Sequence, residues 1–489
     1  MQMPQRDDRQ SGPSTNSKKD PNTPDWRTPF QHDHDRLLYS PYFRRLGGVT
    51  QVVSSQEGLT HVFHTRLTHT LKVAQIARRL AERLKETVKS GEIEIDPDVA
   101  EAAALAHDLG HPPFGHTAEQ KLNQLVKKAS GQDHEGFEGN AQSFRIITRL
   151  AIRMNHRNND EWKWDQNQLG LDLTRATLNA VLKYPWRWEK EGKKKEKFGA
   201  YTEDDEAFGF ARNGCTNDIR SVEADIMDLA DDITYAIHDV EDFYKAGLIP
   251  LELFARHYAE DDHNKVQKQP QDKEIDDFLE YTYKKWGKKG LLKELNLTNK
   301  EKFKEKVGEI ISNRTEGISK DRYKGLPTQM ALFSEDFTNR FLNDCFRQIN
   351  LTPSPPATSG TFKWIIVPSA MRIDIEVLKS LTWYYVIEGR SLASQQTGCQ
   401  KIIECLFNWA FNYLNKEKIE LKVFPEWVKY FVEKELEENK TSNKNKNKKQ
   451  FFARTAADFV ASLTEQQAYE LYYRINGFSA GSILNPITA

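Results

Sequence analysis

The segment that most constrains the fold is Ala102–Glu119, with the sequence AAALAHDLGHPPFGHTAE. Its run of small residues is typical of a tightly packed helix and leads directly into His107 and Asp108. A glycine and two prolines then enforce a turn, after which the chain continues with His116 and Glu119. Burying ionisable groups costs free energy unless they are paired or hold a ligand. So many histidines and carboxylates around one enforced turn indicate a functional segment that the rest of the chain surrounds.

The helix before the turn is expected to run from Pro97 to Leu109, because Asp96 is a good N-cap and proline is favoured at the first helical position. The glycine and prolines beyond it are stop signals. Adjacent side chains do not share a helix face, so His107 and Asp108 reach one ion only if it lies against the helix end. The alternative is a histidine favoured by the helix dipole, with the aspartate in an ion pair.

The helix after the turn is expected to begin near Phe114. His116 and Glu119 lie at i and i+3, so the carboxylate can orient the imidazole for proton transfer. A capping interaction is the alternative for this pair. His134, on the polar segment 132–142, either lines a cleft or is an ordinary loop residue.

A second informative helix is expected over Ser221–Ala246, where acidic residues accompany an apolar stripe. Asp231, Tyr235 and Asp239 recur every fourth position and share one face, whereas Asp232 is turned about 100° away from Asp231. A tyrosine between two aspartates suggests the wall of a polar pocket, and a solvated acidic face is the alternative.

Metal binding is one use for these groups. His69, in the first turn of a helix expected over 64–84, can join His107, Asp108 and a carboxylate of the acidic helix. Two imidazoles and two carboxylates suit Mn²⁺, Fe²⁺, Co²⁺ or Zn²⁺, and Mg²⁺ less well. Spacing alone does not establish that these separated residues converge, and a lone histidine in a first turn is otherwise a surface or capping residue.

The bulk properties narrow the class of protein. The 489 residues exceed one simple core and are enough for a large domain with elaborations. With 70 basic and 71 acidic residues, the chain is not a polycation built for nucleic acid. Four cysteines without a CxxC pattern favour a reducing compartment. There is no apolar run long enough for a bilayer and no signal-peptide core, so we expect a cytoplasmic protein.

Helical periodicity dominates, so the expected fold class is all-α, a helical core with additional peripheral helices and few or no strands. The expected organisation is a disordered tail over 1–25, a core over 26–250, a peripheral helical insertion over 251–360, and a C-terminal helical region over 361–489 that packs on the core. Further expected features are a helix, turn and strand within 33–60, helices over 141–154, 173–184, 373–386, 400–414 and 456–475, a loop over 353–360, and a mobile basic loop over 439–450.

Seven ordered motifs resemble one known family. They are FRRLGGVTQV (43–52), HTRLTHTLKV (64–73), HDLGHPPFGHTAE (107–119), FEGNAQSFRI (137–146), LKYP (182–185), KFGAY (197–201) and ADDITYAIHDVED (230–242). In order and spacing they resemble the deoxyguanosinetriphosphate triphosphohydrolases, within the HD-domain metal-dependent phosphohydrolases. RTAADFVASLT (454–464) is similar to that family's C-terminal end.

The resemblance implies a role for each matching residue and makes 26–250 an HD-domain catalytic core. The implied ligands of a divalent metal (Mn²⁺, Mg²⁺, Co²⁺ or Fe²⁺) are His69, His107, Asp108 and Asp231. The implied catalytic pair is His116 and Glu119. The implied contacts to sugar and phosphates are Gln51, Arg66, His111, Lys183, Tyr184, Lys197, Tyr235 and Asp239. Many relatives read FEHN where this chain has FEGN, so Gly139 replaces a histidine.

The resemblance implies a dNTP triphosphohydrolase, with dGTP as the first candidate substrate. The products would be deoxyguanosine and inorganic triphosphate, formed by metal-assisted attack of water on the α-phosphorus. A homo-oligomer, such as a hexamer, is implied as well, and activation by single-stranded DNA or by a nucleotide is left open.

Two alternatives remain at this point. One is an HD-type phosphodiesterase or nucleotidase, which Lys183, Tyr184 and Lys197 disfavour because a monophosphate does not need them. The other is a nucleic-acid-binding regulatory protein with a structural metal site, which the lysine-rich loops allow.

Overall fold

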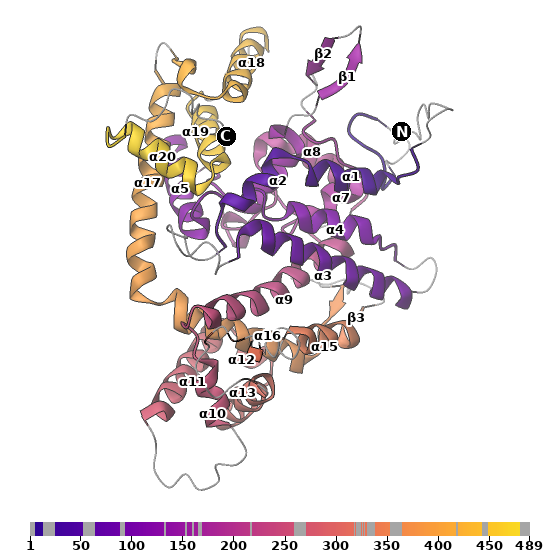
Figure 1. The fold of residues 1–489 in the computed structure, drawn as a ribbon. Coiled ribbons are helices and arrows are strands. Elements are labelled where there is room, and N and C mark those ends of the chain that lie inside the picture. Colours follow the sequence, from indigo (N-terminus) through magenta and orange to yellow (C-terminus); the bar gives the residue numbers. More distant parts are fainter. Residues whose placement is uncertain are drawn as a thin grey trace.

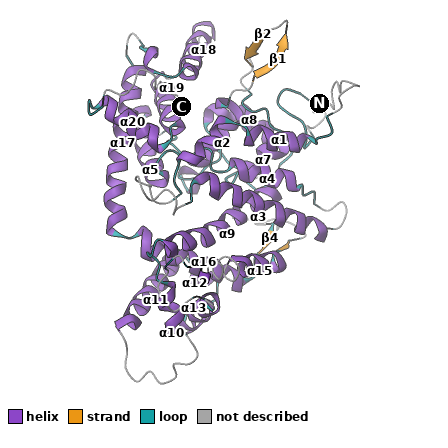
Figure 2. Cartoon of the chain, in the orientation of Figure 1, coloured by secondary structure: helices purple, strands orange, loops and turns teal. Residues whose placement is uncertain are grey.

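The described part of the chain is mostly helical, with four short strands (Figures 1 and 2), which confirms the all-α fold class. The computed structural model describes residues 5–12, 25–51, 64–88, 93–131, 134–151, 154–158, 161–164, 169–215, 218–258, 270–316, 318, 324, 326, 328–329, 338–352, 364–416, 419–442 and 448–479. None of the helices within these ranges is both long and apolar enough to cross a membrane.

The first half of the chain forms one group of packed helices. Its elements are α1 (Pro29–Leu38), α2 (Pro41–Arg45), η1 (Leu46–Gly48), α3 (Arg66–Thr87), α4 (Pro97–Ala106), α5 (Gly115–Ser130), α6 (Gly139–Arg145), η2 (Ile146–Leu150), α7 (Arg175–Val181), η3 (Lys193–Lys195), η4 (Thr202–Asp204), α8 (Asp205–Ala211) and α9 (Val222–Lys245). A short antiparallel hairpin, β1 (Met154–Asn158) with β2 (Glu161–Trp164), projects from it.

The second half supplies the remaining helices and a two-residue strand pair, β3 (Asn350–Leu351) with β4 (Ile365–Ile366). Its helices are α10 (Leu251–His257), α11 (Pro270–Lys288), α12 (Leu291–Glu294), α13 (Lys300–Thr315), α15 (Arg340–Gln348), α16 (Ser369–Thr382), η6 (Trp383–Ile387), α17 (Arg390–Leu414), η7 (Leu421–Val423), α18 (Glu426–Ser442), α19 (Lys448–Ser462) and α20 (Glu465–Ile475).

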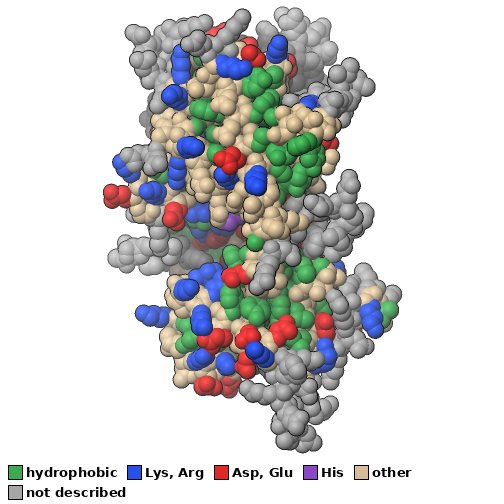
Figure 3. Space-filling view, turned by 90° about the vertical axis from the view of Figure 1, so that its left-hand side faces the viewer, with side chains coloured by type: hydrophobic (Ala, Val, Ile, Leu, Met, Phe, Trp, Pro, Cys, Tyr) green, Lys and Arg blue, Asp and Glu red, His purple; other side chains and the backbone are tan. Residues whose placement is uncertain are grey.

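The two halves are interleaved. Helix α16 packs on α9, whereas α17 and α19 pack on α5. In Figure 1, α17 therefore runs along one side of the molecule, between the α16 region and the group formed by α5, α19 and α20. The space-filling view of that side shows a hollow between the upper and lower parts of the protein, with charged side chains and a histidine inside it (Figure 3).

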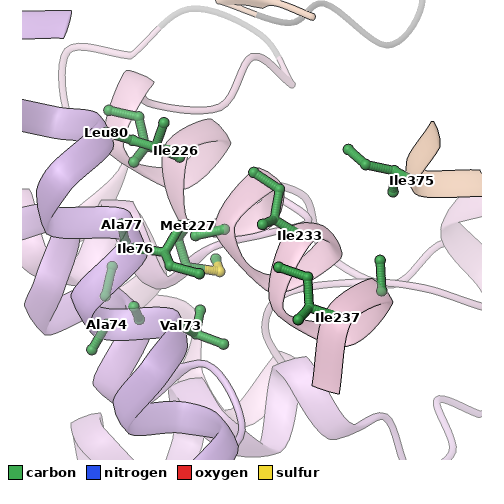
Figure 4. Close-up of a cluster of buried hydrophobic side chains, with 14 of the residues drawn as sticks. Val73, Ala74, Ile76, Ala77, Leu80, Ile226, Met227, Ile233, Ile237 and Ile375 are labelled. Carbon is green, nitrogen blue, oxygen red and sulfur yellow. The ribbon is translucent and has the colours of Figure 1, made fainter. Parts of the chain in front are cut away.

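The core of the first half forms around α3, α4 and α9, which all contact one another. Figure 4 shows apolar side chains of α3, such as Val73 and Leu80, facing Ile226 and Met227 of α9, with Ile375 of α16 on the far side of α9. The alanines of α4 are buried as well, and small side chains let the three helices approach closely. The close packing of the small residues of α4 therefore places the segment that follows, with His107, deep in the helical core.

The turn after α4 differs from the expectation, because the helix ends at Ala106 rather than Leu109. The Ser143 hydroxyl donates to the carbonyl oxygen of His107 over 2.8 Å and accepts from the Gly110 amide over 2.9 Å. These two hydrogen bonds replace the backbone hydrogen bonds that would continue the helix beyond Ala106. A Cβ at residue 110 would lie 2.3 Å from the backbone of both Gly139 and Ser143, so only glycine allows this close approach to α6.

The C-terminal segment contains two helices where one was expected over 456–475. Helix α19 ends at Ser462 and α20 begins after Thr464, whose side chain accepts from the Gln467 amide while the Gln467 side chain accepts from the Thr464 amide. This capping box is the physical reason for the break. Helices α18 and α19 also extend into the expected loop over 439–450, of which residues 443–447 lie outside the described residues.

Other boundaries shift for similar local reasons. The helix expected over 141–154 begins at Gly139, where Glu138 caps it, and gives way to η2 and β1. The helix expected over 400–414 begins at Arg390, and the one expected over 373–386 begins at Ser369 and ends in the π-helical turn η6. The helix expected over 173–184 is limited to α7. The loop over 353–360 lies outside the described residues, as do residues 52–60 of the segment 33–60, in which a helix, a turn and a strand were expected.

Part of the expected N-terminal tail lies against the core. Arg9 donates to the Asp33 carboxylate over 2.6 Å, and its backbone forms a bridge with Thr174. Asp33 is fully buried and also accepts from the hydroxyl and amide of Thr174. Residues 5–12 therefore pack beside α1 and α7, and nothing more of segment 1–24 is described.

Candidate active site

A cavity of about 480 Å³ lies between the two halves of the protein. One wall comes from the turn between α4 and α5, the start of α3, the segment after α7 and the middle of α9. The opposite wall comes from η6 and the first turns of α17. The hollow in Figure 3 is seen from the side of the molecule along which α17 runs.

Four side chains that the sequence separates by up to 162 residues meet at the first wall, where three of them line the cavity and His69 is fully buried beside them. His69, His107 and Asp108 offer ligand atoms that all lie within 4.8 Å of one another. Asp231 joins them, since its Oδ1 lies 3.0 Å from Nε2 of His69 and 3.7 Å from Nε2 of His107. His69 and His107 are buried, and Asp231 comes from α9.

The tautomer of His107 suits metal binding. Its Nδ1–H donates to the carbonyl oxygen of Ala104 over 2.7 Å, so Nε2 is the nitrogen that can give up its proton and bind a metal. Within the described part of the chain, this buried Nε2 has no hydrogen-bond partner. It points to the carboxylate of Asp108, 3.4 Å away. A buried imidazole nitrogen without a partner, facing carboxylates, is the arrangement expected of a ligand set whose cation would complete it.

Electrostatics at this cluster lead to the same conclusion. Burial alone would lower the pKa of His107, but Asp108 and Asp231 outweigh burial and raise it to about 9. Burial would raise the pKa of Asp108, but His107 and Arg66 hold it well below its usual range. In the metal-free site, a proton on His107 therefore offsets part of the negative charge of Asp108 and Asp231. A divalent cation between these groups would offset more of it. The donor set of two imidazoles and two carboxylates fits such a cation.

Two further residues with implied phosphate contacts surround Asp108. Arg66 is buried and donates from Nη1 to Asp108 Oδ2 over 2.6 Å. Nδ1 of His111 lies 3.1 Å from Asp108 Oδ1. Both side chains line the cavity, so each oxygen of the Asp108 carboxylate lies beside a nitrogen of one of them.

His116 and Glu119 form a hydrogen-bonded pair on the first turns of α5. Nδ1 of His116 lies 2.8 Å from Oε2 of Glu119. The other carboxylate oxygen accepts from the Gly139 amide over 3.2 Å and from Lys197 Nζ over 3.1 Å. Burial would raise the pKa of Glu119, but the bond from His116 and the charge of Lys197 lower it below its usual range. The carboxylate therefore stays ionised and holds a proton on Nδ1 of His116, whose side chain is 66% exposed.

Two lysines reach the same wall from the segment after α7. Lys183 Nζ lies 2.7 Å from Asp228 and 3.4 Å from Asp231. Lys197 Nζ lies 3.0 Å from Glu138 in addition to its contact with Glu119. Tyr184 also lines the cavity. One ammonium group, that of Lys183, therefore lies beside the candidate metal ligand Asp231, and the other, that of Lys197, lies beside Glu119 of the histidine–glutamate pair.

The remaining candidates differ in their position. Gln51 and Tyr235 line the cavity, and Asp239 is buried one helical turn beyond Tyr235. Burial raises the pKa of Asp239 well above its usual range. His134 donates from Nδ1 to the carbonyl oxygen of Glu135 and is not part of the wall. A Cβ at Gly139 would lie 3.5 Å from the His111 ring and 3.7 Å from the Glu119 carboxyl carbon, so this position faces the site.

The opposite wall was not predicted from the sequence. Its residues are Trp383, Ile387, Leu392, Gln395, Gln396 and Cys399. Trp383 falls in the helix expected over 373–386, to which only a packing role was given, and the other five lie in 387–399, where no element was expected from the sequence. The Lys285 ammonium lies 3.5 Å above the Trp383 ring, an arrangement typical of a cation–π contact.

Comparison with known proteins agrees with this geometry. Residues 66–236 match the HD domain, and residues 365–474 match the phosphohydrolase-associated domain. A deoxyguanosinetriphosphate triphosphohydrolase-like protein of Bifidobacterium longum is 30% identical over 456 residues, which are 91% of this chain and 82% of the relative. Proteins of the same description from Corynebacterium efficiens and Streptomyces coelicolor are each 44% identical, over 47% and 46% of this chain and 49% of each relative.

The two matched domains coincide with the two walls of the cavity: the first contributes the histidines, aspartates and Lys183, and the second contributes η6 and α17. The ligand set fits the divalent cation on which HD-domain phosphohydrolases depend. The chain is an HD-domain metal-dependent phosphohydrolase and belongs to the family of deoxyguanosinetriphosphate triphosphohydrolase-like proteins.

Proposed function

We propose that this protein is a dNTP triphosphohydrolase that cleaves dGTP, among the dNTPs, to deoxyguanosine and inorganic triphosphate. One observation carries the proposal. A single wall of the cavity holds a candidate metal site, a histidine–glutamate pair and the cationic groups of Arg66, Lys183 and Lys197. The names of the relatives, which are called deoxyguanosinetriphosphate triphosphohydrolase-like, support dGTP as the first substrate to test.

We assign the metal to His69, His107, Asp108 and Asp231, with Mn²⁺, Mg²⁺, Co²⁺ and Fe²⁺ as the ions to compare. A divalent cation held by these residues would supply Lewis-acid stabilisation of charge on a phosphate oxygen. Neighbouring side chains hold the two carboxylates in place. Arg66 and His111 contact Asp108, and Lys183 contacts Asp231.

His116 is assigned to proton transfer at the reacting phosphate. Glu119 holds its Nδ1 proton, so Nε2 is the atom that exchanges a proton with water or with the leaving 5′-oxygen. Gly139 and Lys197 in turn hold Glu119. This arrangement orients the imidazole from behind while its outer edge faces the cavity.

The two lysines are assigned to the phosphate chain. Both are paired with carboxylates in the free protein, so their ammonium groups are already oriented before a polyphosphate displaces part of these contacts. A monophosphate would not occupy both, which favours a triphosphate substrate over the nucleotidase alternative.

Tyr235 and Asp239 are assigned to the sugar. The tyrosine forms part of the wall on α9, one turn from Asp231, and burial together with the neighbouring Asp239 carboxylate raises the pKa of its hydroxyl well above the usual range. A deoxyribose packed against this ring leaves little room for a 2′-hydroxyl, so GTP should be a poor substrate.

The test is a product profile. The purified protein is incubated with each dNTP and with GTP in the presence of Mn²⁺, and the products are resolved by anion-exchange chromatography. We expect deoxynucleoside and inorganic triphosphate, with dGTP consumed fastest and GTP left intact. Release of a monophosphate with pyrophosphate, or of a diphosphate, contradicts the proposal.

We further propose that the active form is a homo-oligomer, as the resemblance implies. Size-exclusion chromatography with light scattering tests this, and repeating it with and without dNTPs or single-stranded DNA tests the activator. A monomer that turns over dGTP at full rate contradicts the oligomer.

A further inference from the structure

The junction between α19 and α20 meets the active-site turn. Three segments that are far apart in the sequence pack together here: residues 45–50, the turn over 109–114, and residues 463–465 of the phosphohydrolase-associated domain. A Cβ at Gly48 would lie 2.8 Å from the Thr464 side chain, so the first and last of these segments are in close contact.

Glu465 is the polar group that joins all three segments. Its Oε1 accepts from the Thr50 amide over 3.1 Å, from the Thr50 hydroxyl over 2.6 Å and from the Phe114 amide over 3.3 Å. The side chain is buried. Thr50 precedes Gln51 in the cavity wall, and Phe114 precedes the helix that carries His116. One carboxylate oxygen therefore contacts the backbone just before Gln51 and just before the helix that carries His116.

Arg45 connects the same junction to the other end of the turn. Its guanidinium donates to the carbonyl oxygen of Leu463 over 3.0 Å. It also donates to the carbonyl oxygens of Leu109 over 2.8 Å and His111 over 2.7 Å, on either side of Gly110. Arg45 thus holds the turn near the proposed metal ligands, and Glu465 holds it near His116. Both contacts involve the α19–α20 junction, because Arg45 also bonds to Leu463 and Glu465 is part of the junction.

The residue at the end of the turn needs such support. Phe114 has φ 67° and ψ 15°, the left-handed region that a non-glycine residue rarely adopts. Its ring packs edge-to-face against Tyr469 of α20, with centroids 5.2 Å apart. Helix α20 therefore holds both the amide and the side chain of this strained residue.

We propose that Glu465 is a positioning residue for the active site: through the Phe114 amide it fixes the orientation of His116 relative to the metal ligands. The inference rests on the proposed function for its catalytic consequence. It gives the phosphohydrolase-associated domain a task at the catalytic turn, in addition to the cavity wall formed by η6 and α17.

An alternative role for Glu465 is purely local. It is the first residue of α20, where a negative charge is favoured by the helix dipole. The two roles predict different behaviour for Glu465→Gln. The amide oxygen of glutamine can still accept the three hydrogen bonds, but the charge is lost. Glu465→Ala removes both, and Glu470→Ala, on the exposed part of the same helix, is the matched control.

The experiment measures hydrogen exchange and kinetics on the full-length protein. We expect Glu465→Ala to raise amide exchange in a peptide covering 109–118. The kcat for dGTP should fall about 10- to 100-fold, because a small misplacement of a catalytic group is enough for that loss, while KM and Mn²⁺ affinity stay near the wild-type values. Glu465→Gln should resemble the wild type in both measurements, as should Glu470→Ala.

Two results would overturn the inference. One is unchanged exchange over 109–118 in Glu465→Ala, and the other is a Glu465→Gln variant as impaired as Glu465→Ala. Failure of the proposed function can be distinguished from both results. Even if the wild-type protein does not hydrolyse dNTPs, hydrogen exchange over 109–118 still shows whether Glu465 holds the turn.

Discussion

The two walls of the cavity differ in chemistry. The wall built by the HD domain carries imidazoles, carboxylates, an arginine and two lysines, nearly all in ion pairs. The wall built by η6 and α17 carries an indole, aliphatic side chains and two neutral amides. Charged groups suit phosphates and a metal, whereas a flat aromatic ring and amides suit a nucleobase. We therefore expect the reaction at the first wall and discrimination between bases at the second.

The largest expected effect is loss of the metal site in the first wall. Asp231→Asn should reduce metal-dependent turnover about 10³-fold or more, since the cation's charge stabilisation is lost, and His107→Ala should do the same. Asp232→Asn is the matched control, because Asp232 is the next residue of α9 and pairs with Lys379 instead. Steady-state rates together with circular dichroism check this. An Asp231→Asn variant that keeps its activity would remove the metal assignment.

The next largest effect separates proton transfer from metal binding within the same wall. Glu119→Gln and His116→Ala should each lower kcat about 10²- to 10⁴-fold, the usual contribution of a general acid or base. Mn²⁺ affinity, measured by calorimetry, should change little, because neither residue contacts the four proposed ligands. Equal loss of metal binding and turnover would show that the two groups of residues are not separate.

A smaller effect is expected at the lysines that we assign to the phosphate chain. Lys183→Ala should raise KM for dGTP about tenfold, as expected for loss of one charge-assisted contact of about 1.5 kcal/mol. Lys194→Ala is the control, since Lys194 lies in the exposed loop and pairs with Glu189 and Asp218. If both variants behave alike, Lys183 serves only to neutralise Asp228 and Asp231.

The pH dependence of metal affinity gives a further contrast between the walls. The pKa of His107 is raised to about 9 in the metal-free site, so between pH 6 and 8 the metal must displace a proton. The apparent Kd for Mn²⁺ should therefore fall about tenfold for each unit of rising pH. The ratio of rates for dGTP and dATP should stay constant between pH 6 and 7, because the residues that line the second wall are neutral and Lys285, which packs on Trp383 and whose pKa burial lowers to about 8, keeps its charge there. A Kd independent of pH would contradict the assignment of His107.

The smallest effects are expected in the second wall. Gln395→Ala and Gln396→Ala should change the ratio of kcat/KM among the four dNTPs about 2- to 10-fold, the value of one or two hydrogen bonds. Thr397→Ala, on the exposed face of the same helix, should leave the ratio unchanged. If every substrate is affected equally, the base is read elsewhere.

The same contrast explains what could be predicted from the sequence. The helix-face argument separated Asp231 from Asp232, and the structure has one at the histidines and the other at Lys379. Ionisable residues beside breaks such as Gly110 are visible in sequence because they are unusual there. Gln395 and Trp383 are not unusual in an amphipathic helix, so nothing local marked them.

Long-range contacts were beyond prediction for a different reason. The hydrogen bonds of Glu465 join residues 415 positions apart in the sequence. Only the packing of α20 determines that they meet, and propensity carries no information on such distances. The end of α4 was also misplaced, because the Ser143 hydroxyl competes for the carbonyl oxygen of His107 from another helix.

The most direct test of the account is hydrolysis of dGTP in ¹⁸O-labelled water with Mn²⁺. Attack on the α-phosphorus with loss of the 5′-oxygen predicts that inorganic triphosphate carries the label and that deoxyguanosine carries none. Label in orthophosphate, in pyrophosphate or in a nucleotide product would contradict it, because the phosphate chain would then be cut at another bond.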